Sequence, residues 1–456
     1  MPNYPQFVPR WALLAALLCG LCLQAGHAQT AAAPAPSTAP ANSDARTAPV
    51  ALSRDAQRAY ESTRDKLVQI RTLLRNSNTQ ASVGSGFFVA SNGLIITNFH
   101  VASQLALEPG RYRGVFVPID GKEGEVELLA FDVRNDLALL RVKGSAANMP
   151  VLAFREPGKL LNRGERIYSL GNPLDIGFAV TEGTYNGLRQ RSFYPRIFFG
   201  GALNPGMSGG PAIDDAGRVV GVNVSKRMGG ELLSFLIPAD FAQALLARAA
   251  NAQPITKPAH AEVARQLLDH QELLTKRFTA APLMPQKHGG YSVPVPEDSL
   301  ARCWGRGRES DFKAFDLERT DCQIDSYLFA GDFNTGYISL RHEAYDAPKL
   351  GPWRYASMVS RSFANENFQT RGSRKATAAE CTERFITTGG MAMRAVVCMS
   401  AYRKLPGLYD VAVLTMSVNE PLRGVLGRLD AQGVSFDNGL KLVDHYLGGY
   451  QWEAAP

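Results

Sequence analysis

The sequence predicts a mainly β protein, with a sandwich or barrel over residues 82–238 and an α+β region after it. Short apolar runs rich in β-branched and aromatic residues recur between Gly-rich turns, as is typical of all-β domains. Asn92-Gly93 separates two of these runs, and Asn-Gly is the strongest short signal for a β-hairpin. After Pro254 and Pro258 the apolar residues take helical spacing, so we expect a domain boundary there.

The composition is that of a packed soluble protein. Of the 456 residues, 45% are hydrophobic and 20% are charged, which excludes a wholly disordered chain, a collagen-like chain and a polytopic membrane protein. The length suits two or three domains. The formal net charge is +7, from 49 basic and 42 acidic residues, and no segment is a polybasic run. We therefore expect no nucleic-acid partner.

The amino terminus has the pattern of a secretory signal peptide. Arg10 precedes the apolar run Trp11–Leu23, and the small residues Gly26 and Ala28 follow it, which predicts cleavage after Ala28. The run is short of the roughly 20 residues that a membrane span needs, so no stable span is expected after cleavage. An uncleaved anchor is the alternative. Residues 1–28 thus predict export to the periplasm or the medium.

The elements of the mature chain are predicted in order. Residues 29–53 are rich in Ala, Pro, Ser and Thr and cannot bury enough apolar surface to fold, so we expect a linker. Residues 54–65 have helical character, and the apolar run 66–75 begins the sheet. Val83–Ala90 and Leu94–Thr97 are the arms of the hairpin. Further strands are predicted at Tyr112–Pro118, Glu125–Phe131, Leu137–Val142, Arg166–Leu170, Phe178–Asn186, Ile197–Gly200, Arg218–Val224 and Leu232–Ile237.

The second region, residues 260–456, mixes helices and strands. Val263, Leu267 and Leu274 form an apolar stripe that predicts a helix over 262–277. Packing against the β-rich domain is its simplest expected role, with a hinge or an oligomer contact as alternatives. Later elements are predicted as strands at Tyr327–Phe329, Gly336–Leu340, Ala395–Cys398 and Val411–Val418, and a helix near Asn438–Tyr446.

Four cysteines remain after the signal peptide, namely Cys303, Cys322, Cys381 and Cys398. An even number in an exported protein predicts two disulfides, and three connectivities are open. We favour the local pairs Cys303–Cys322 and Cys381–Cys398, with four unpaired thiols as the alternative. These four cysteines show no C-x-x-C spacing, and no metal, nucleotide or flavin motif is evident, so no metal and no cofactor are expected.

His100, Asp136 and Ser208 occur in this order, each in a short distinctive segment. A serine hydroxyl becomes a nucleophile when a neutral imidazole removes its proton, and a carboxylate orients that imidazole. Glycines beside the serine allow a sharp turn whose N–H groups stabilise an oxyanion. His100 is the only histidine between residues 28 and 259, so it is the only candidate base in that region. Taken singly, each residue also fits a turn, a cap or a core position.

Six sequence blocks together resemble the chymotrypsin-fold serine proteases, and among them the HtrA/Deg family. The resemblance covers roughly residues 66–245, under half of the chain. They are Ser85-Gly-Phe-Phe-Val, Gly93-Leu-Ile-Ile-Thr-Asn-Phe-His100-Val, Asn135-Asp136-Leu-Ala-Leu-Leu, Gly171-Asn-Pro, Asn204-Pro-Gly206-Met-Ser208-Gly-Gly-Pro and Phe235-Leu-Ile-Pro238.

This resemblance implies two antiparallel six-stranded β-barrels within a protease domain at 54–250, followed by a separate α+β domain. The triad would be His100, Asp136 and Ser208, in the cleft between the barrels. The residues implied for the rest of the site are Gly206 and Ser208 for the oxyanion hole, with the Met207 N–H nearby, Ala202 for the floor of the S1 pocket, and Asn223, Val224 and Ser225 for the strand that pairs with substrate. An uncharged floor predicts a small or medium aliphatic P1 residue.

The expected substrates are unfolded or extended polypeptides, and the chain departs from the family pattern in three places. Met207 occupies a position that is usually Asn, the Asp usual before the S1 alanine is missing, and no PDZ module follows residue 250. We hypothesise that the domain at 260–456 regulates access to the cleft or recruits substrate. Oligomers are possible, as in the family.

Two other functions are alternatives to proteolysis. Gly206-Met-Ser208-Gly-Gly210 also fits the nucleophile elbow of α/β-hydrolases, but that fold needs a helix after the serine and the order Ser, acid, His. A catalytically silent peptide-binding or chaperone-like protein on a protease fold is the stronger alternative.

Overall fold

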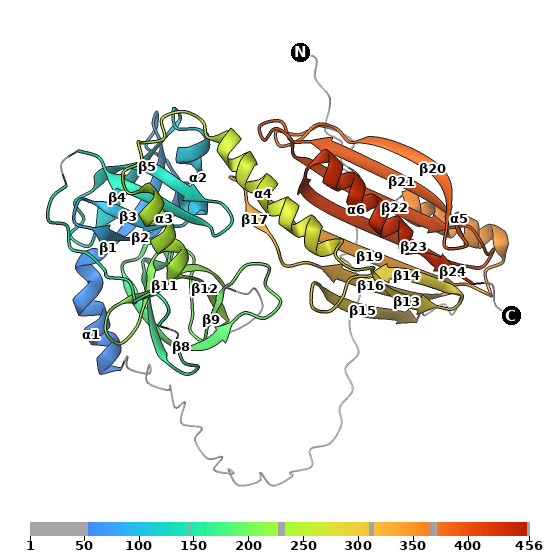
Figure 1. The fold of residues 1–456 in the computed structure, drawn as a ribbon, viewed down its shortest axis with the longest axis horizontal. Helices are drawn as coiled ribbons and strands as arrows, with labels where there is room; N and C mark the ends of the chain where they lie inside the picture. The colour runs from blue at the N-terminus through green and yellow to red at the C-terminus, as the bar shows by residue number, and fades with distance from the viewer. Residues whose placement is uncertain are drawn as a thin grey trace, which may run out of the picture. The chain divides into compact units, whose positions relative to one another are not determined.

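Figure 1 shows the computed structural model, which describes residues 53–144, 146–159, 161–226, 233–309, 314–364, 366, 368 and 372–453. The predicted signal peptide lies outside these residues, and so does the predicted linker apart from Ser53. The Ser53 hydroxyl accepts a hydrogen bond from the Ala56 N–H and caps helix α1 (Arg54–Thr63). Each helix in the described ranges is too short or too polar to cross a bilayer.

The first barrel is a closed antiparallel sheet with strand order β1-β2-β3-β6-β5-β4. Its strands are β1 (Leu67–Leu74), β2 (Gln80–Ala90), β3 (Leu94–Thr97), β4 (Tyr112–Pro118), β5 (Gly124–Asp132) and β6 (Leu137–Val142). The predicted hairpin joins β2 to β3, and Gly93 has a φ of 83° in its turn. This left-handed conformation suits glycine because a side chain there is strained.

The second barrel has strand order β10-β11-β12-β9-β8-β7 and is closed by pairing of β7 with β10. Its strands are β7 (Arg166–Gly171), β8 (Ala179–Leu188), β9 (Ile197–Phe199), β10 (Pro211–Ile213), β11 (Val219–Lys226) and β12 (Ser234–Pro238). Two short 3₁₀ helices complete the region, η1 (Arg64–Lys66) and η2 (Pro173–Asp175). The two closed six-stranded barrels confirm the expected fold.

Strand β6 lies between the interior of the first barrel and the interface of the two barrels. Ala138 and Leu140 belong to the interior cluster, whereas Leu137 and Leu139 pack with residues of the second barrel. Alternate residues of a strand point to opposite faces, so a run of four apolar residues serves both cores. The turn before β6 therefore lies at the junction of the barrels.

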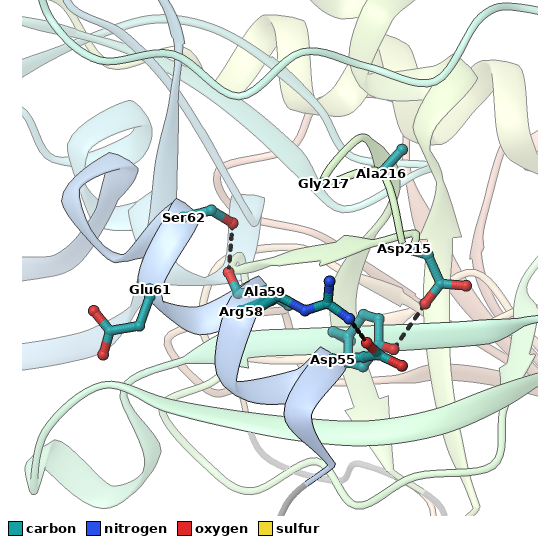
Figure 2. Close-up of a pocket in the computed structure, with 9 residues that line it drawn as sticks. Asp55, Arg58, Ala59, Glu61, Ser62, Asp215, Ala216 and Gly217 are labelled. Carbon is teal, nitrogen blue, oxygen red and sulfur yellow. Dashed lines mark hydrogen bonds and ion pairs between the residues drawn. The ribbon is translucent and has the colours of Figure 1, made fainter.

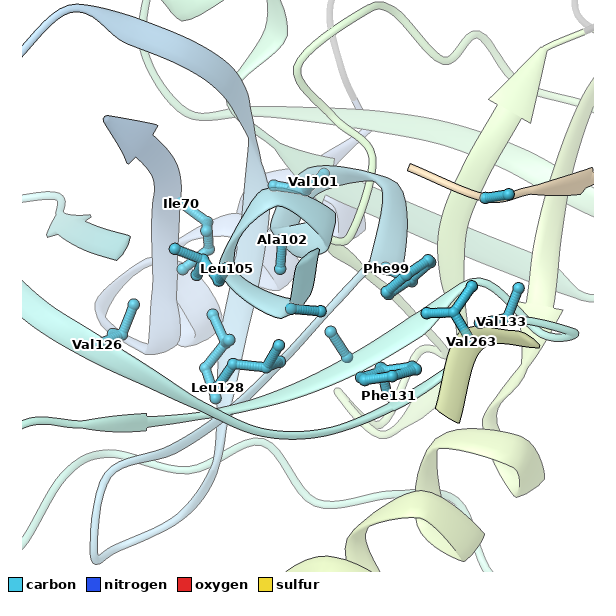
Figure 3. Packing of buried hydrophobic residues seen from close by; sticks show 14 of the residues in the cluster. Ile70, Phe99, Val101, Ala102, Leu105, Val126, Leu128, Phe131, Val133 and Val263 are labelled. Atoms are coloured by element: carbon cyan, nitrogen blue, oxygen red, sulfur yellow. The ribbon is translucent and has the colours of Figure 1, made fainter. Parts of the chain in front are cut away.

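Helix α2 (Phe99–Leu107) fills one end of the first barrel. Figure 3 shows its side chains Val101, Ala102 and Leu105 among those of the barrel strands. Phe99 stacks on Phe131 of β5, with ring centroids 4.9 Å apart. This buried packing fixes the start of the helix, where His100 lies.

Among the elements that the sequence analysis did not predict are α2, β10 and α3 (Ala239–Ala249) in the barrel region. We expected strands and turns throughout residues 82–238, but Phe99–Leu107 form helix α2 directly after the hairpin, and His100 lies in this helix. Most residues of α2 are buried, so the helix lacks the polar stripe that reveals amphipathic helices. Strand β10 has three residues, too few for a visible alternation.

The C-terminal domain is built on a seven-stranded antiparallel sheet with order β15-β16-β19-β23-β22-β21-β20. Its strands are β15 (Arg302–Glu309), β16 (Asp316–Gln323), β19 (Ile338–Asp346), β20 (Glu380–Thr388), β21 (Met391–Ala401), β22 (Tyr409–Ser417) and β23 (Arg423–Val434). Smaller sheets contain β13 (Met284–His288), β14 (Tyr291–Val295) and β24 (Gln451–Trp452), and β17 (Leu328–Phe329) with β18 (Asn334–Thr335). The helices are α4 (His260–Phe278), α5 (Pro352–Ala364) and α6 (Phe436–Gly448).

Helices cover both faces of this sheet. Helices α4 and α6 lie side by side on one face, where Val411 and Val413 point, and α5 packs on the other face, where Leu414 and Met416 point (Figure 1). The predicted helices at 262–277 and 438–446 are confirmed, and each predicted strand overlaps an observed one, although β19 and β21 extend several residues beyond their predicted bounds.

Helix α4 contributes to two cores. Val263, Ala264 and Leu267 join the interior cluster of the first barrel, and Leu274 and Phe278 join the cluster beneath the seven-stranded sheet. The expected packing on the barrel is confirmed for the first half of the helix. The helix therefore connects the two domains through apolar contacts at both ends.

Both predicted disulfides are present. Cys303 pairs with Cys322 between the adjacent strands β15 and β16, and Cys381 pairs with Cys398 between β20 and β21. In each case the two cysteines lie directly opposite each other in the strand register. Each bridge therefore joins the two outermost strands at one edge of the sheet.

Candidate active site

His100 and Asp136 are in direct contact. The ring nitrogen Nδ1 of His100 lies 2.7 Å from Asp136 Oδ2, and the His100 backbone N–H donates to Asp136 Oδ1 at 2.8 Å. The Asn98 side-chain amide donates to the Asp136 carbonyl oxygen at 2.8 Å. One carboxylate thus orients both the imidazole ring and the start of α2, and it leaves Nε2 for another partner.

The turn before β6 holds Asp136 in this position. The Asn135 N–H and side-chain amide donate to the Asp132 carboxylate at 3.1 and 2.9 Å. Asp136 itself has a φ of 56°, a left-handed conformation that Asp tolerates better than most residues. The Asp136 carboxylate also faces the N-terminal end of α2, where the helix dipole favours a negative charge.

The pKa of the His100 imidazole is raised above its usual value near 6.5. Burial by itself lowers this pKa, because an apolar surrounding disfavours the charged ring. The charge of Asp136 and the hydrogen bond to its carboxylate act in the opposite direction and together outweigh burial. Asp136 therefore stabilises a protonated His100, the form that a general base takes during catalysis.

The loop that carries Ser208 packs against residues on both sides of His100. A side-chain carbon on Gly209 would lie only 2.4 Å from Thr97 Oγ1. One on Gly84 would lie 2.5 Å from the Val101 side chain and 2.9 Å from the Ser208 carbonyl oxygen. These approaches are possible because both positions are glycine. The loop is thereby brought against the segment from which the imidazole projects.

The Ser208 hydroxyl donates a long hydrogen bond of 3.4 Å to the Val224 carbonyl oxygen. Within the described residues it forms no hydrogen bond with the His100 ring. The structure thus brings His100 and Asp136 together and places Ser208 in the neighbouring loop, with its hydroxyl turned toward β11.

Ser85 of β2 holds the Ser208 loop from the first barrel. Its backbone N–H donates to the Ser208 carbonyl oxygen at 2.7 Å, and its hydroxyl donates to the Gly206 carbonyl oxygen at 2.7 Å. The Ser85 hydroxyl in turn accepts from the Asn172 N–H at 2.9 Å. Two carbonyl groups of the loop are therefore directed toward β2.

The N–H groups of Gly206 and Ser208 have no hydrogen-bond acceptor among the described residues. Gly206 has a φ of 93°, and a side-chain carbon there would lie 2.4 Å from the Asn172 carbonyl oxygen, so only glycine fits. Two unengaged N–H groups flanking a serine are the donors that an oxyanion requires.

Met207 points into the core of the second barrel, where 1% of its surface is exposed. The residue that departs from the family pattern therefore contributes an apolar side chain to the core of the second barrel. Ala202 is half-buried in the loop between β9 and β10, next to the buried Leu203.

The three residues named for the substrate strand differ in what they offer. Asn223 is fully buried, its backbone bonds to Gly209 and Gly210, and its side-chain amide donates to the Met207 carbonyl oxygen at 3.2 Å. It therefore positions the Ser208 loop and has no group free for a substrate backbone. Val224 is the extra residue of a β-bulge, and Ser225 pairs with Phe235 of β12.

Phe329 was not found by sequence reasoning, although it lies against the His100 ring. The two ring centroids are 6.0 Å apart at an interplanar angle of 76°. Phe329 belongs to β17 of the C-terminal domain, far from His100 in the chain. No sequence pattern identifies such a contact, because it depends on how two domains pack.

A second depression lies on the surface beside helix α1. Figure 2 shows a depression of about 810 Å³ beside α1, lined by Asp55, Arg58, Tyr168 and Asp215 among others. Its charged groups are engaged locally, since Arg58 pairs with Asp55 and the Tyr168 hydroxyl donates to Asp215 at 2.7 Å. Within the described ranges, no three His, Cys, Asp or Glu side chains gather closely enough to hold a metal ion.

Comparison with known proteins finds a matching family model for a segment within the two barrels. Residues 84–222 match the family model described as a trypsin-like peptidase domain. The probable periplasmic serine endoprotease DegP-like of Pseudomonas putida (strain GB-1) is 36% identical over 169 residues, covering 35% of this chain and 33% of the relative. The protein of the same name from Halomonas elongata is 34% identical over 174 residues, covering 37% and 35%.

The chain spans about a third of the length of these curated relatives. Among solved structures, the serine endoprotease from Yersinia pestis matches with a TM-score of 0.37 at 23% identity, covering 43% of this chain and 67% of that one. The sequence match coincides with the double barrel and includes His100, Asp136 and Ser208. Residues 84–222 are therefore similar to trypsin-like peptidase domains, and the double barrel that contains them is similar to part of the DegP-like relatives.

Proposed function

We propose that this protein is an exported serine endopeptidase that hydrolyses unfolded or extended polypeptides through His100, Asp136 and Ser208. The observation that carries the proposal is the His100–Asp136 pair, at 2.7 Å, beside a glycine-rich loop with two unengaged N–H groups. The matched relatives are periplasmic serine endoproteases by name, which supports the same activity and a periplasmic location here.

The chemistry follows from the roles of these groups. The Ser208 hydroxyl turns from Val224 to His100 Nε2, gives up its proton and attacks the carbonyl carbon of the scissile bond. The N–H groups of Gly206 and Ser208 stabilise the resulting oxyanion. The protonated His100, held by Asp136, gives its proton to the leaving amine, and the acyl-enzyme is then hydrolysed by water.

The substrate would lie extended along the end of β11. Because Asn223 is committed to the loop, the Val224 carbonyl oxygen is the first acceptor on this strand for a substrate N–H. Ala202 brings no charge to the proposed S1 pocket, so we expect cleavage after small or medium aliphatic residues such as Val, Ala or Leu.

A fluorophosphonate probe tests the nucleophile. We expect covalent labelling of the mature full-length protein, its loss in Ser208→Ala, and normal labelling of the control Ser62→Ala, whose hydroxyl lies on α1. The wild type should cleave unfolded casein, mostly after aliphatic residues, whereas Ser208→Ala should not. Cleavage mainly after Lys or Arg would contradict the proposed S1 pocket.

A catalytically silent peptide-binding protein is the second candidate. The observation that favours it is the Ser208 hydroxyl, which bonds to Val224 in place of His100. This candidate predicts no labelling of Ser208 under any condition, even with unfolded protein added, together with retained binding of extended peptides. Labelling that depends on Ser208 would exclude it.

A further inference from the structure

A cavity of about 320 Å³ opens directly beside His100 and is shared by the two domains. The peptidase domain contributes His100, Val133, Arg134, Asp136, Arg189, Ser192, Tyr194, Arg196, Val224 and Phe235. The C-terminal domain contributes the consecutive residues 325–329 and Asn334, from the β17–β18 hairpin and the segment before it. The cavity is thus continuous with the proposed site, since His100 and Val224 line both.

The hairpin wall is attached to the barrels by specific contacts. The Ser103 hydroxyl of α2 donates to the Gly331 carbonyl oxygen at 3.2 Å, and the Phe193 N–H donates to the Asp325 carbonyl oxygen at 3.2 Å. Leu328 and Ala330 are buried in the interior cluster of the first barrel. The wall is therefore part of the folded molecule at the position it occupies beside His100.

The charges that line this cavity do not balance. Three arginines face two aspartates, and each aspartate already has a partner. Asp136 binds His100, and Asp325 forms an ion pair with Arg189. Arg134 and Arg196 remain, and within the described residues neither forms an ion pair with a carboxylate.

Arg196 is a half-buried cation of this cavity. Its guanidinium donates to the carbonyl oxygens of Pro195 at 2.9 Å and of Arg134 at 3.3 Å, which satisfy some of its five N–H groups and supply no negative charge. Burial lowers the pKa of Arg196, and the nearby charges of Asp136 and Asp132 raise it but compensate only in part for the lost solvation. A carboxylate entering the cavity would supply the missing charge through charge-assisted hydrogen bonds.

We propose that this cavity binds an acidic side chain of the substrate, located on the N-terminal side of the scissile bond, through Arg196 and Arg134. We place the side from Val224, which lines the cavity and belongs to the strand that we take to pair with the residues before the scissile bond. The C-terminal domain is then a specificity element that forms one wall of the subsite. This inference rests on the proposed function for its direction along the substrate.

Peptide binding to full-length Ser208→Ala protein tests the proposal without requiring catalysis. Extended fluorescent peptides carry Glu or Gln at the second, third or fourth residue before an aliphatic P1 residue, or at matching places after it. We expect at least one Glu peptide of the first group to bind roughly tenfold more tightly than its Gln partner, the usual scale for a bond between charged groups. Adding Arg196→Gln or Arg134→Gln should reduce the difference.

The exposed Arg163 of the second barrel provides the matched control, and Arg163→Gln should keep the preference for Glu. If Arg196→Gln fails to fold, Arg134→Gln still tests the inference, because each variant must reduce the preference for Glu over Gln peptides. Equal binding of Glu and Gln peptides at every place would overturn the inference and leave the proposed protease intact. Tighter binding of Glu peptides in a protein whose Ser208 never reacts with fluorophosphonate would support the subsite and refute the protease.

Discussion

His100 is the residue at which two opposing effects on one pKa decide the chemistry. Burial disfavours the imidazolium, whereas the charge and hydrogen bond of Asp136 favour it, and the net pKa is raised. A general base must be neutral before it accepts a proton, so a raised pKa reduces the active fraction at low pH. The same raised pKa makes the imidazole a stronger acceptor once it is neutral.

We therefore expect the rate of fluorophosphonate labelling of Ser208 to rise with pH through a midpoint above 6.5. In Asp136→Asn the two raising effects disappear while burial remains, so the midpoint should fall below 6.5, and the rate should drop by roughly 10⁴-fold. Glu127→Gln breaks only a surface ion pair with Arg141 and should leave the midpoint unchanged. An unshifted midpoint in Asp136→Asn would contradict the assigned role.

Among elements, the β17–β18 hairpin connects the C-terminal domain to the proposed chemistry. Phe329 covers one edge of the His100 ring and also contacts Phe99, with centroids 6.5 Å apart. Aromatic contacts of this kind contribute about 0.5–1.5 kcal/mol beyond the area they bury. The hairpin is thus positioned to exclude water from the imidazole and to contact bound substrate.

For Phe329→Ala we expect kcat/KM for a peptide substrate to fall roughly 2- to 12-fold, the range that corresponds to that contact energy. Trp353→Ala is the matched control, because Trp353 is an aromatic residue of the same domain that is 89% exposed on α5. The measurement is steady-state hydrolysis, with thermal unfolding to verify the fold. A rise in kcat/KM would instead identify the hairpin as an obstruction of the cleft.

For the molecule as a whole, buried histidines link stability to pH. His270 of α4 donates from Nε2 to the Gly336 carbonyl oxygen and accepts from the Tyr194 hydroxyl at Nδ1, both at 2.7 Å. It thereby joins the second barrel, α4 and the segment after β18. Burial lowers the pKa of His270 to about 4 and that of His342 to about 3. Both side chains are therefore neutral in the folded protein at pH 7.

The free energy of unfolding should decrease as pH falls below 6.5, because the unfolded chain then binds protons at His270 and His342 that the folded chain excludes. Between pH 7.5 and 5 each histidine should lower it by about 2 kcal/mol. Urea denaturation of wild type and His270→Gln at both pH values measures this effect. The variant should lose less stability on acidification, and an equal loss would contradict the inference.

Much of the fold could be predicted because its signals are local. The Asn92-Gly93 turn, the alternating strands and the stripe on α4 are patterns of neighbouring residues, and each element formed near its predicted bounds. Helix α2 escaped prediction because burial on nearly all sides removes the polar face. The commitment of Asn223 to the Ser208 loop was also missed, since an amide side chain shows its partners only after folding.

From the sequence alone came the two barrels and the three residues proposed for catalysis, because they rest on short motifs in a fixed order. The favoured disulfide pairs came from the sequence too, because each joins cysteines close together in the chain. Tertiary structure alone decided that Ser85 directs two carbonyl groups of the Ser208 loop, that Phe329 lies on His100, and that Arg196 faces a shared cavity. The physical reason is that these contacts join residues distant in the chain. They arise when whole elements pack to bury apolar surface, which no local pattern records.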